Sequence, residues 1–157
     1  KPYGEFNTTN VNLRSGPSAS FTSLGKFNTG THVDVINAVN GWICCIADGK
    51  LGYVRGDYID VKLFPSPIAA QQRVCEAKTT EAAALRTSPS QYAAEIVSLS
   101  EGAQIRVWFE IGDWYYVRIG HRSGFVEKSK IIIGDWFIID LHAIFSSQID
   151  DGILPRP

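Results

Sequence analysis

The amino-acid sequence predicts an all-β protein built from two small β-barrels in tandem. The main observation is an internal repeat: residues 8–59 match residues 80–131 without a gap, with 11 identities in 52 positions, where unrelated segments would share about three. The identical pairs are Thr8/Thr80, Leu13/Leu85, Arg14/Arg86, Pro17/Pro89, Ser18/Ser90, Gly30/Gly102, Val35/Val107, Trp42/Trp114, Gly52/Gly124, Val54/Val126 and Ile59/Ile131. Within each copy, short β-forming runs alternate with tight turns. A sheet of such short strands leaves bare edges unless it curls into a barrel.

Each copy is expected to hold about five strands. In the first copy they are expected at residues 5–14, 31–37, 42–46, 52–55 and 59–61. The segment at residues 15–18, Ser-Gly-Pro-Ser, must start a loop, because glycine permits positive φ and proline fixes φ. Asn40-Gly41 and Asp48-Gly49 are typical of hairpin turns. The second copy repeats this pattern 72 residues later.

The boundaries follow from the repeat. We expect a first domain at residues 1–63, a proline-containing linker at 64–73, a second domain at 74–133 and a C-terminal extension at 134–157. Ser66-Pro67 could also cap a short helix over residues 68–72.

The extension is too apolar to be a disordered tail. Its apolar side chains alternate with polar ones, and they are Phe137, Ile139, Leu141, Ala143 and Phe145. This pattern predicts an extra strand that packs on the second barrel or seals the joint between the barrels. Two alternatives remain: a helix capped by Asp135, or a third, truncated repeat, because residues 134–136 (Gly-Asp-Trp) echo residues 112–114.

Composition argues against several functions. The net charge is −1 and no cluster of Lys and Arg occurs, so we expect no nucleic-acid partner and no binding to anionic lipid. No apolar run reaches 18 residues, so we expect no membrane insertion. The sequence contains no Met and starts with Lys-Pro, which we interpret as a removed signal peptide or a trimmed start.

Two motifs resemble one family. The segment Leu13-Arg14-Ser15-Gly16-Pro17-Ser18 resembles the "N-V-R-S-G-P-S" opening of bacterial SH3 (Src homology 3) domains. Gly41-Trp42 followed by Gly52-Tyr53-Val54 resembles the "G-W-x-x-V … G-W-V" strands of that family, and the second copy repeats both motifs except for Ser88 in place of glycine. The resemblance implies two SH3-like β-barrels that bind rather than catalyse. It also implies a secreted or cell-envelope protein, since such domains often accompany peptidoglycan hydrolases and dock them on cell-wall peptides.

The resemblance also implies a ligand groove. Residues 52–59 have the spacing of "G-Y-I-P-S-N-Y-V" in eukaryotic SH3 domains, where a strand Trp and the last Tyr line the peptide groove. By position, the candidates are Trp42, Arg55, Tyr58 and Phe21 in the first copy, and Trp114, Glu127, Lys130 and Tyr92 in the second. The two tryptophans could instead only cover the ends of the barrels. A proline-rich ligand is not expected, because the loop at residues 15–24 contains no acidic residue.

Arg14 and Arg86 are interpreted as structural residues that tie each loop to its barrel. Among the cysteines, Cys45 is expected in the core and Cys44 on the outside, because strand neighbours point to opposite faces. A disulfide between Cys44 and Cys75 is possible, but free thiols are favoured.

No catalytic or metal site is expected. The histidines at positions 32, 121 and 142 are single residues near turns or in the tail, and no motif sets a nucleophile beside a base. Adjacent Cys44-Cys45 is poor spacing for zinc. We therefore expect no enzyme activity, no metal and no cofactor.

The sequence thus indicates a binding module for peptidoglycan peptides that targets a protein to the cell wall. The alternative is a protein–protein interaction module of a secreted or envelope protein whose groove binds a peptide segment of a protein. A third hypothesis is the targeting part of a cell-wall hydrolase.

Overall fold

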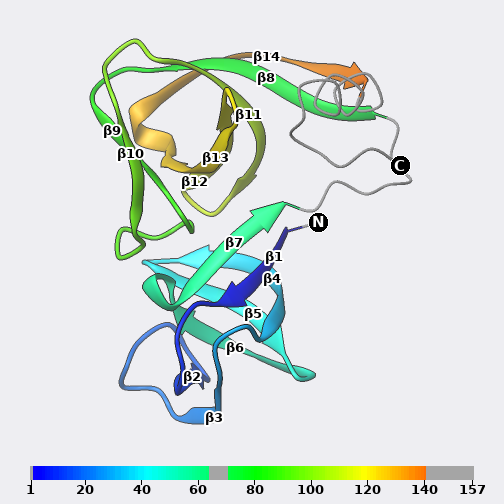
Figure 1. Ribbon diagram of the computed structural model, residues 1–157, viewed down its shortest axis with the longest axis vertical. Coiled ribbons are helices and arrows are strands. Elements are labelled where there is room, and N and C mark those ends of the chain that lie inside the picture. The colour runs from blue at the N-terminus through cyan, green and yellow to red at the C-terminus, as the bar shows by residue number, and fades with distance from the viewer. Residues whose placement is uncertain (1, 64–70, 141–157) are drawn as a thin grey trace.

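The computed structural model describes residues 2–63 and 71–140, and it confirms the all-β class with two separate seven-stranded antiparallel sheets (Figure 1). The first barrel consists of β1 (Pro2–Phe6), β2 (Val11–Arg14), β3 (Ser23–Phe27), β4 (His32–Val39), β5 (Trp42–Ala47), β6 (Lys50–Arg55), the 3₁₀ turn η1 (Gly56–Tyr58) and β7 (Ile59–Leu63). The second consists of β8 (Gln71–Thr79), β9 (Ala83–Arg86), β10 (Glu95–Leu99), β11 (Gln104–Ile111), β12 (Trp114–Ile119), β13 (Arg122–Glu127), the 3₁₀ turn η2 (Lys128–Lys130) and β14 (Ile131–Asp140).

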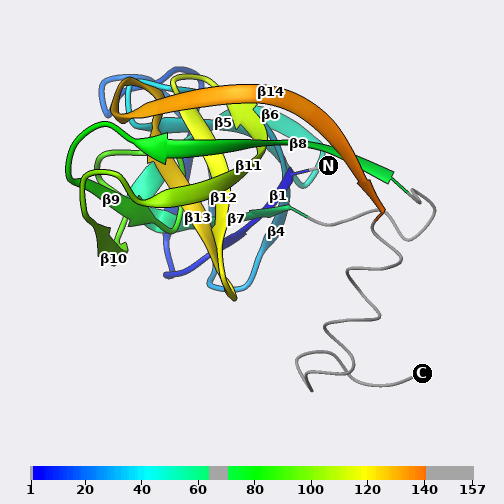
Figure 2. The same cartoon turned by 90° about the horizontal axis from the view of Figure 1, so that it is seen from above.

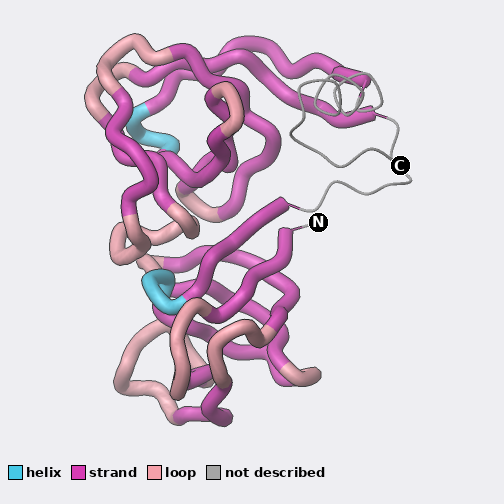
Figure 3. Tube along the Cα trace, in the orientation of Figure 1, coloured by secondary structure: helices cyan, strands magenta, loops and turns pink. Residues whose placement is uncertain are grey.

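The two sheets share one topology. The strand orders are β3-β2-β6-β5-β4-β1-β7 and β10-β9-β13-β12-β11-β8-β14, which are the same order shifted by seven strands. Each sheet curls around its own axis, and the two barrels lie end to end along the long axis of the molecule (Figure 3). Within the described residues, no helix is long and apolar enough to span a bilayer.

The repeated residues build the two cores. Leu13 and Leu85, and likewise Val54 and Val126, are fully buried at equivalent places. Gly52 is required by close packing, because a Cβ there would lie 2.6 Å from the side chain of Leu13. The identities between the copies therefore mark the positions at which a small barrel tolerates little change in volume.

One expected strand is in fact two. The strand predicted over residues 5–14 is broken into β1 and β2 by a turn, and Asn10 in this turn has φ 61°. Asparagine tolerates the left-handed region better than most residues. Because β-forming residues run through this turn, the sequence pattern did not indicate it. Residues of the turn line the candidate site.

The described part of the extension, residues 134–140, forms a strand, as predicted. β14 pairs antiparallel with β8 from Ile131 to Asp140, with a register shift between Ile133 and Trp136, and the two strands run side by side past the barrel (Figure 2). Asp135 lies inside this strand, so the alternatives of a capped helix and of a third repeat are wrong. Leu141, Ala143 and Phe145 lie outside the described residues.

The start of the second barrel also differs from expectation. β8 begins at Gln71, so the end of the short helix expected over residues 68–72 is strand instead. The other residues at which that helix was expected, 68–70, lie outside the described residues.

The loop between β9 and β10, residues 87–94, is inserted against the first barrel (Figure 1). The Ser88 hydroxyl donates to the carbonyl oxygen of Gly56 at 2.6 Å, and the Ser90 hydroxyl donates to that of Gly41 at 2.8 Å. Both serines are 0% exposed. The backbone N–H of Val61, on edge strand β7, donates to the carbonyl of Thr87 at 3.0 Å. The second barrel thereby satisfies polar groups at an edge that would otherwise be open.

Apolar packing completes the joint. One continuous cluster contains Ala38 and Val61 of the first barrel together with Trp114 and Tyr116 of the second. Gly112, with φ +55°, lies so close to Ala38 that a Cβ there would be 2.4 Å from the Ala38 carbonyl oxygen. The barrels are therefore packed against each other and not merely linked.

Replacing Ser90 by alanine should destabilise the whole chain. The substitution removes the hydroxyl bond to the buried Gly41 carbonyl, which keeps the Gly56 N–H as a partner, and it removes the acceptor of the Tyr92 N–H. The loss of each such hydrogen bond costs about 0.5–1.5 kcal/mol of unfolding free energy. Ser18 is the matched control, because it occupies the same loop position in the first copy and its hydroxyl forms hydrogen bonds with Ser20 of its own loop. Urea unfolding followed by tryptophan fluorescence should show a clearly smaller loss of unfolding free energy for Ser18→Ala than for Ser90→Ala. Equal losses would show that the contact between the barrels adds no stability.

Candidate functional site

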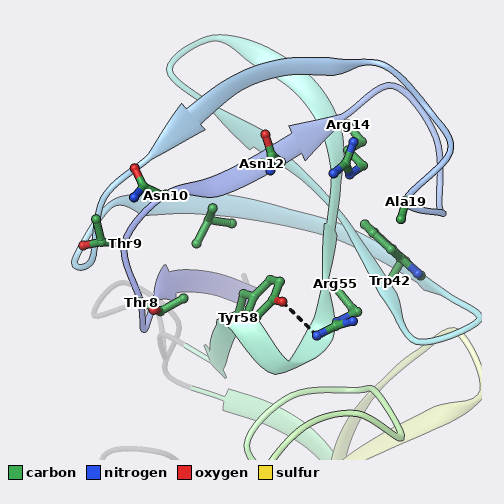
Figure 4. Close-up of a pocket in the computed structure, with 10 residues that line it drawn as sticks. Thr8, Thr9, Asn10, Asn12, Arg14, Ala19, Trp42, Arg55 and Tyr58 are labelled. Atoms are coloured by element: carbon green, nitrogen blue, oxygen red, sulfur yellow. Dashed lines mark hydrogen bonds between the residues drawn. The ribbon is translucent and has the colours of Figure 1, made fainter.

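A groove of about 340 Å³ opens on the first barrel (Figure 4). Its walls come from the β1–β2 turn, strand β2, the loop after β2, the start of β5 and the turn η1. The lining residues are Thr8, Thr9, Asn10, Val11, Asn12, Arg14, Ala19, Trp42, Arg55 and Tyr58. The groove thus brings together three of the predicted residues, Trp42, Arg55 and Tyr58.

Local geometry places these three side chains. Asn40 (φ 50°) and Gly41 (φ 86°) form the tight turn that ends β4 and starts β5, so Trp42 is the first residue of β5. Trp42 lies directly opposite Arg55 across the β5–β6 pair, which brings their side chains close on one face. The turn η1 then returns the chain, so that Tyr58 and Trp42 lie on either side of Arg55 (Figure 4).

Arg55 is held in place by two neighbours. Its guanidinium makes a two-point salt bridge to Asp57, with both N···O distances 2.8 Å, and also donates to the Tyr58 hydroxyl at 2.8 Å. Its carbon lies 4.7 Å from the centre of the Tyr58 ring. The hydrogen bond to Asp57 is the main cause that raises the pKa of Arg55. Arg55 therefore stays charged, but Asp57 compensates much of that charge, and the groove is polar rather than strongly cationic.

The opposite wall is made by short polar side chains. Thr8, Thr9, Asn10 and Asn12 line the groove from the β1–β2 turn and β2, and Figure 4 shows Thr8 beside Tyr58 with Thr9 and Asn10 at the far end. The motifs gave no reason to select this wall. The repeat could have indicated it, because the second copy has Thr80, Glu81, Ala82 and Ala84 at these positions and loses both asparagines.

The loop arginines hold the loops, as interpreted from the sequence. Arg14 donates to the carbonyl of Phe21 at 3.0 Å, and Arg86 donates to that of Ala93 at 2.8 Å. Phe21 itself is not among the residues lining the groove. Its ring lies over Gly16, where a Cβ would be 2.5 Å from the ring, and Ala19 supplies the loop's contact with the groove.

The four candidates of the second copy do not come together in the same way. Trp114 is only 7% exposed and belongs to the apolar cluster at the joint. Trp114 and Glu127 line a cavity of about 410 Å³ that the first barrel partly covers with its β4–β5 turn, whereas Lys130 does not line it. Tyr92 lies beside Arg55 of the first barrel, 5.8 Å from guanidinium carbon to ring centre. A ligand-binding role for these residues stays a prediction.

The three cysteines are free and buried. Cys44 is only 8% exposed, so its expected exposure to solvent is wrong, although it does not belong to the core cluster that contains Cys45. Its neighbour across the β5–β6 pair is Tyr53, and a hydrogen bond between the two side chains lowers the pKa of the thiol by less than burial raises it. Burial raises the pKa of Cys44 and Cys75, and it raises the pKa of Cys45 to about 12.

These positions disfavour thiol chemistry. A nucleophilic cysteine needs a lowered pKa and access to substrate, and the described cysteines have neither. His32 and His121 are both exposed. Among residues 2–63 and 71–140, no group of three or more His, Cys, Asp and Glu side chains could hold a metal ion.

The raised pKa of Cys45 predicts a loss of stability in alkali. An unfolded thiol has a pKa of about 8.5, so between that pH and about 12 the unfolded state ionises while the folded state holds a neutral thiol. The stabilising difference is complete below about pH 8.5 and falls as pH rises further. The free energy of unfolding, measured in urea at about pH 8 and at about pH 10, should fall less for Cys45→Val than for the wild type. Valine is the residue that the second barrel has at this position, Val117. Identical losses in the variant and the wild type would contradict this.

Comparison with known proteins supports the assignment of the first barrel. The family described as "Bacterial SH3 domain" matches residues 9–60. A putative N-acetylmuramoyl-L-alanine amidase of Bacillus subtilis is 28% identical over 129 residues, which are 78% of this chain and 25% of that protein. A probable endopeptidase p60 of Listeria monocytogenes is 36% identical over 76 residues, 47% of this chain and 16% of that protein. The chain therefore spans a quarter or less of the length of these two relatives.

A solved structure, NlpC1 from Trichomonas vaginalis, aligns over 82% of this chain and 44% of its own length, with 11% identity and a TM-score of 0.36. This likeness is too weak to support an argument. The sequence match is specific, since it spans the loop motif, both hairpin strands and the turn η1 of one barrel. Residues 9–60 thus match the bacterial SH3 domain family, and the second barrel repeats the strand order of the first.

Proposed function

We propose that this chain is a non-catalytic binding module that recognises the peptide part of bacterial peptidoglycan and targets a cell-wall hydrolase to its substrate. The observation that supports this most is the open groove on the first barrel, with an aromatic side made by Trp42 and Tyr58 and a polar side made by Thr and Asn. The relatives named as a cell-wall amidase and an endopeptidase are consistent with this role.

The chemistry of the groove suits an extended peptide. Aromatic faces pack against aliphatic side chains or against the apolar face of a sugar, while hydroxyl and amide groups donate to and accept from a peptide backbone. A volume of about 340 Å³ is at the small end of ligand sites, which fits a few residues of a chain that continues beyond the groove. Neither wall carries a carboxylate that would select a cationic ligand.

The buried thiols support binding rather than catalysis. Cys44, Cys45 and Cys75 are enclosed, with raised pKa values, so the described residues present no activated sulfur to a substrate. In this proposal the catalytic step belongs to another part of a longer protein, and the location is extracellular or at the cell envelope. The alternative occupant of the groove is a peptide segment of another protein.

Sedimentation with purified peptidoglycan tests the proposal. The wild-type chain should pellet with Bacillus subtilis sacculi, and Trp42→Ala or Tyr58→Ala should weaken binding roughly tenfold or more, because truncating an aromatic anchor costs about 2 kcal/mol. Leu51→Ala is the control, since Leu51 is an exposed apolar residue of β6 outside the groove. Circular dichroism must show that all variants are folded.

Two results would refute this assignment. One is the absence of wild-type binding to sacculi, which would favour a protein peptide as ligand. The other is equal binding of the wild type and of both groove variants, which would place the binding surface elsewhere.

A further inference from the structure

Tyr92 belongs to the second barrel by sequence but lies against the first. A Cβ added to Gly41, which has φ +86°, would be 2.6 Å from the Tyr92 ring. The Arg55 guanidinium faces the same ring at 5.8 Å. Gly41 directly precedes Trp42, and Arg55 lines the groove. The Tyr92 ring is therefore next to two of the elements that build the aromatic side of the groove.

The backbone around Tyr92 is fixed. Its N–H donates to the Ser90 hydroxyl at 3.1 Å, and that hydroxyl donates to the carbonyl of Gly41. Ser90 is fully buried, whereas Tyr92 remains 50% exposed. The loop thus holds an aromatic ring at a defined place with half of its surface open to solvent. Such preorganised, open aromatic surface is typical of a binding site.

The guanidinium of Arg55 links this ring to the groove. It lies between Tyr58 of the first barrel, at 4.7 Å, and Tyr92 of the second, at 5.8 Å. Figure 4 shows the chain of the second barrel passing close to Arg55, below the groove. Tyr92 does not line the groove itself, so only a ligand that extends past Arg55 would reach its ring.

The repeat shows that this ring is not needed to build the loop. The counterpart of Tyr92 in the first copy is Ser20, which is exposed in a loop with the same turn: Ser20 N–H donates to Ser18 as Tyr92 N–H donates to Ser90. At this loop position the aromatic side chain occurs only in the copy whose loop packs against the other barrel.

We infer that Tyr92 completes the groove of the first barrel, so that the two barrels form one binding site. This inference rests on the proposed function. The ligand is then longer than the groove of the first barrel. Its central part lies between Trp42, Tyr58 and the polar wall, and the part next to it lays an apolar face on Tyr92. That face can be an aliphatic side chain of a peptide or the ring of a linked sugar.

The test compares matched variants of the full chain. Tyr92→Ala should weaken binding to peptidoglycan sacculi about three- to tenfold, the range expected for one aromatic contact, and Tyr92→Phe should keep near-wild-type affinity. Phe137→Ala is the matched control: Phe137 is another exposed aromatic of the second barrel, 38% exposed, with the Arg106 guanidinium 5.6 Å from its ring centre. We expect Phe137→Ala to bind as the wild type does.

Titration with soluble fragments distinguishes direct contact from an indirect structural effect. The backbone amide of Tyr92 should shift in ¹⁵N–¹H spectra of the wild type as fragment is added. Fragments that contain only the stem peptide and fragments that keep the sugars separate the two sources of the apolar face. If only the latter shift the amide of Tyr92, the sugar is the source.

The outcomes separate this inference from the proposed function. If Trp42→Ala loses binding while Tyr92→Ala binds normally and the Tyr92 amide does not shift, the site belongs to the first barrel alone and the inference is wrong. If the wild type does not bind sacculi, the same variants are measured with peptides selected on the wild-type chain from a random display library. A loss with Tyr92→Ala there supports the inference without peptidoglycan, whereas no loss, or no selected peptide, overturns it.

Discussion

The arrangement of the molecule depends on two buried hydroxyl groups. Ser88 and Ser90 donate to the carbonyl oxygens of Gly56 and Gly41, and a polar group enclosed there without its partner would cost about 1–3 kcal/mol. Gly41 precedes Trp42 and Gly56 follows Arg55, and the Gly56 N–H also donates to the Gly41 carbonyl. The bonds that join the barrels therefore act on the same two backbone positions that set the aromatic side of the groove. Stability of the joint and geometry of the site cannot vary independently.

The repeat has diverged according to this division of roles. In the first copy, the loop after the Leu-Arg motif is open to solvent and contributes Ala19 to the groove. In the second copy, the same loop is an anchor, and serine replaces Gly16 where a hydroxyl is needed to reach the other barrel. Trp114 likewise packs in the joint instead of lining an open groove. An arrangement in which one loop inserts into its neighbour leaves one groove open and partly covers the other.

The sequence predicted the features that lie within a single barrel. Identities between the copies indicated the core, since small barrels tolerate few changes at Leu13, Val54 or Gly52. The motifs selected Trp42, Arg55 and Tyr58, and these three residues line one groove. It could not indicate contacts between copies, because alignment in register treats each unit as independent. Tyr92 was for that reason assigned to the groove of its own barrel. Cys44 was expected to be exposed because strand alternation gives the direction of a side chain and not what covers it.

A shared site has a thermodynamic consequence for the whole chain. A ligand that contacts both barrels binds more tightly when the barrels are docked. It stabilises the docked arrangement by the same free energy. The joint is already held by buried hydrogen bonds and a continuous apolar cluster, so the docked arrangement exists before any ligand arrives. The ligand then needs to order few groups of the protein, so a modest set of aromatic and polar contacts suffices for recognition.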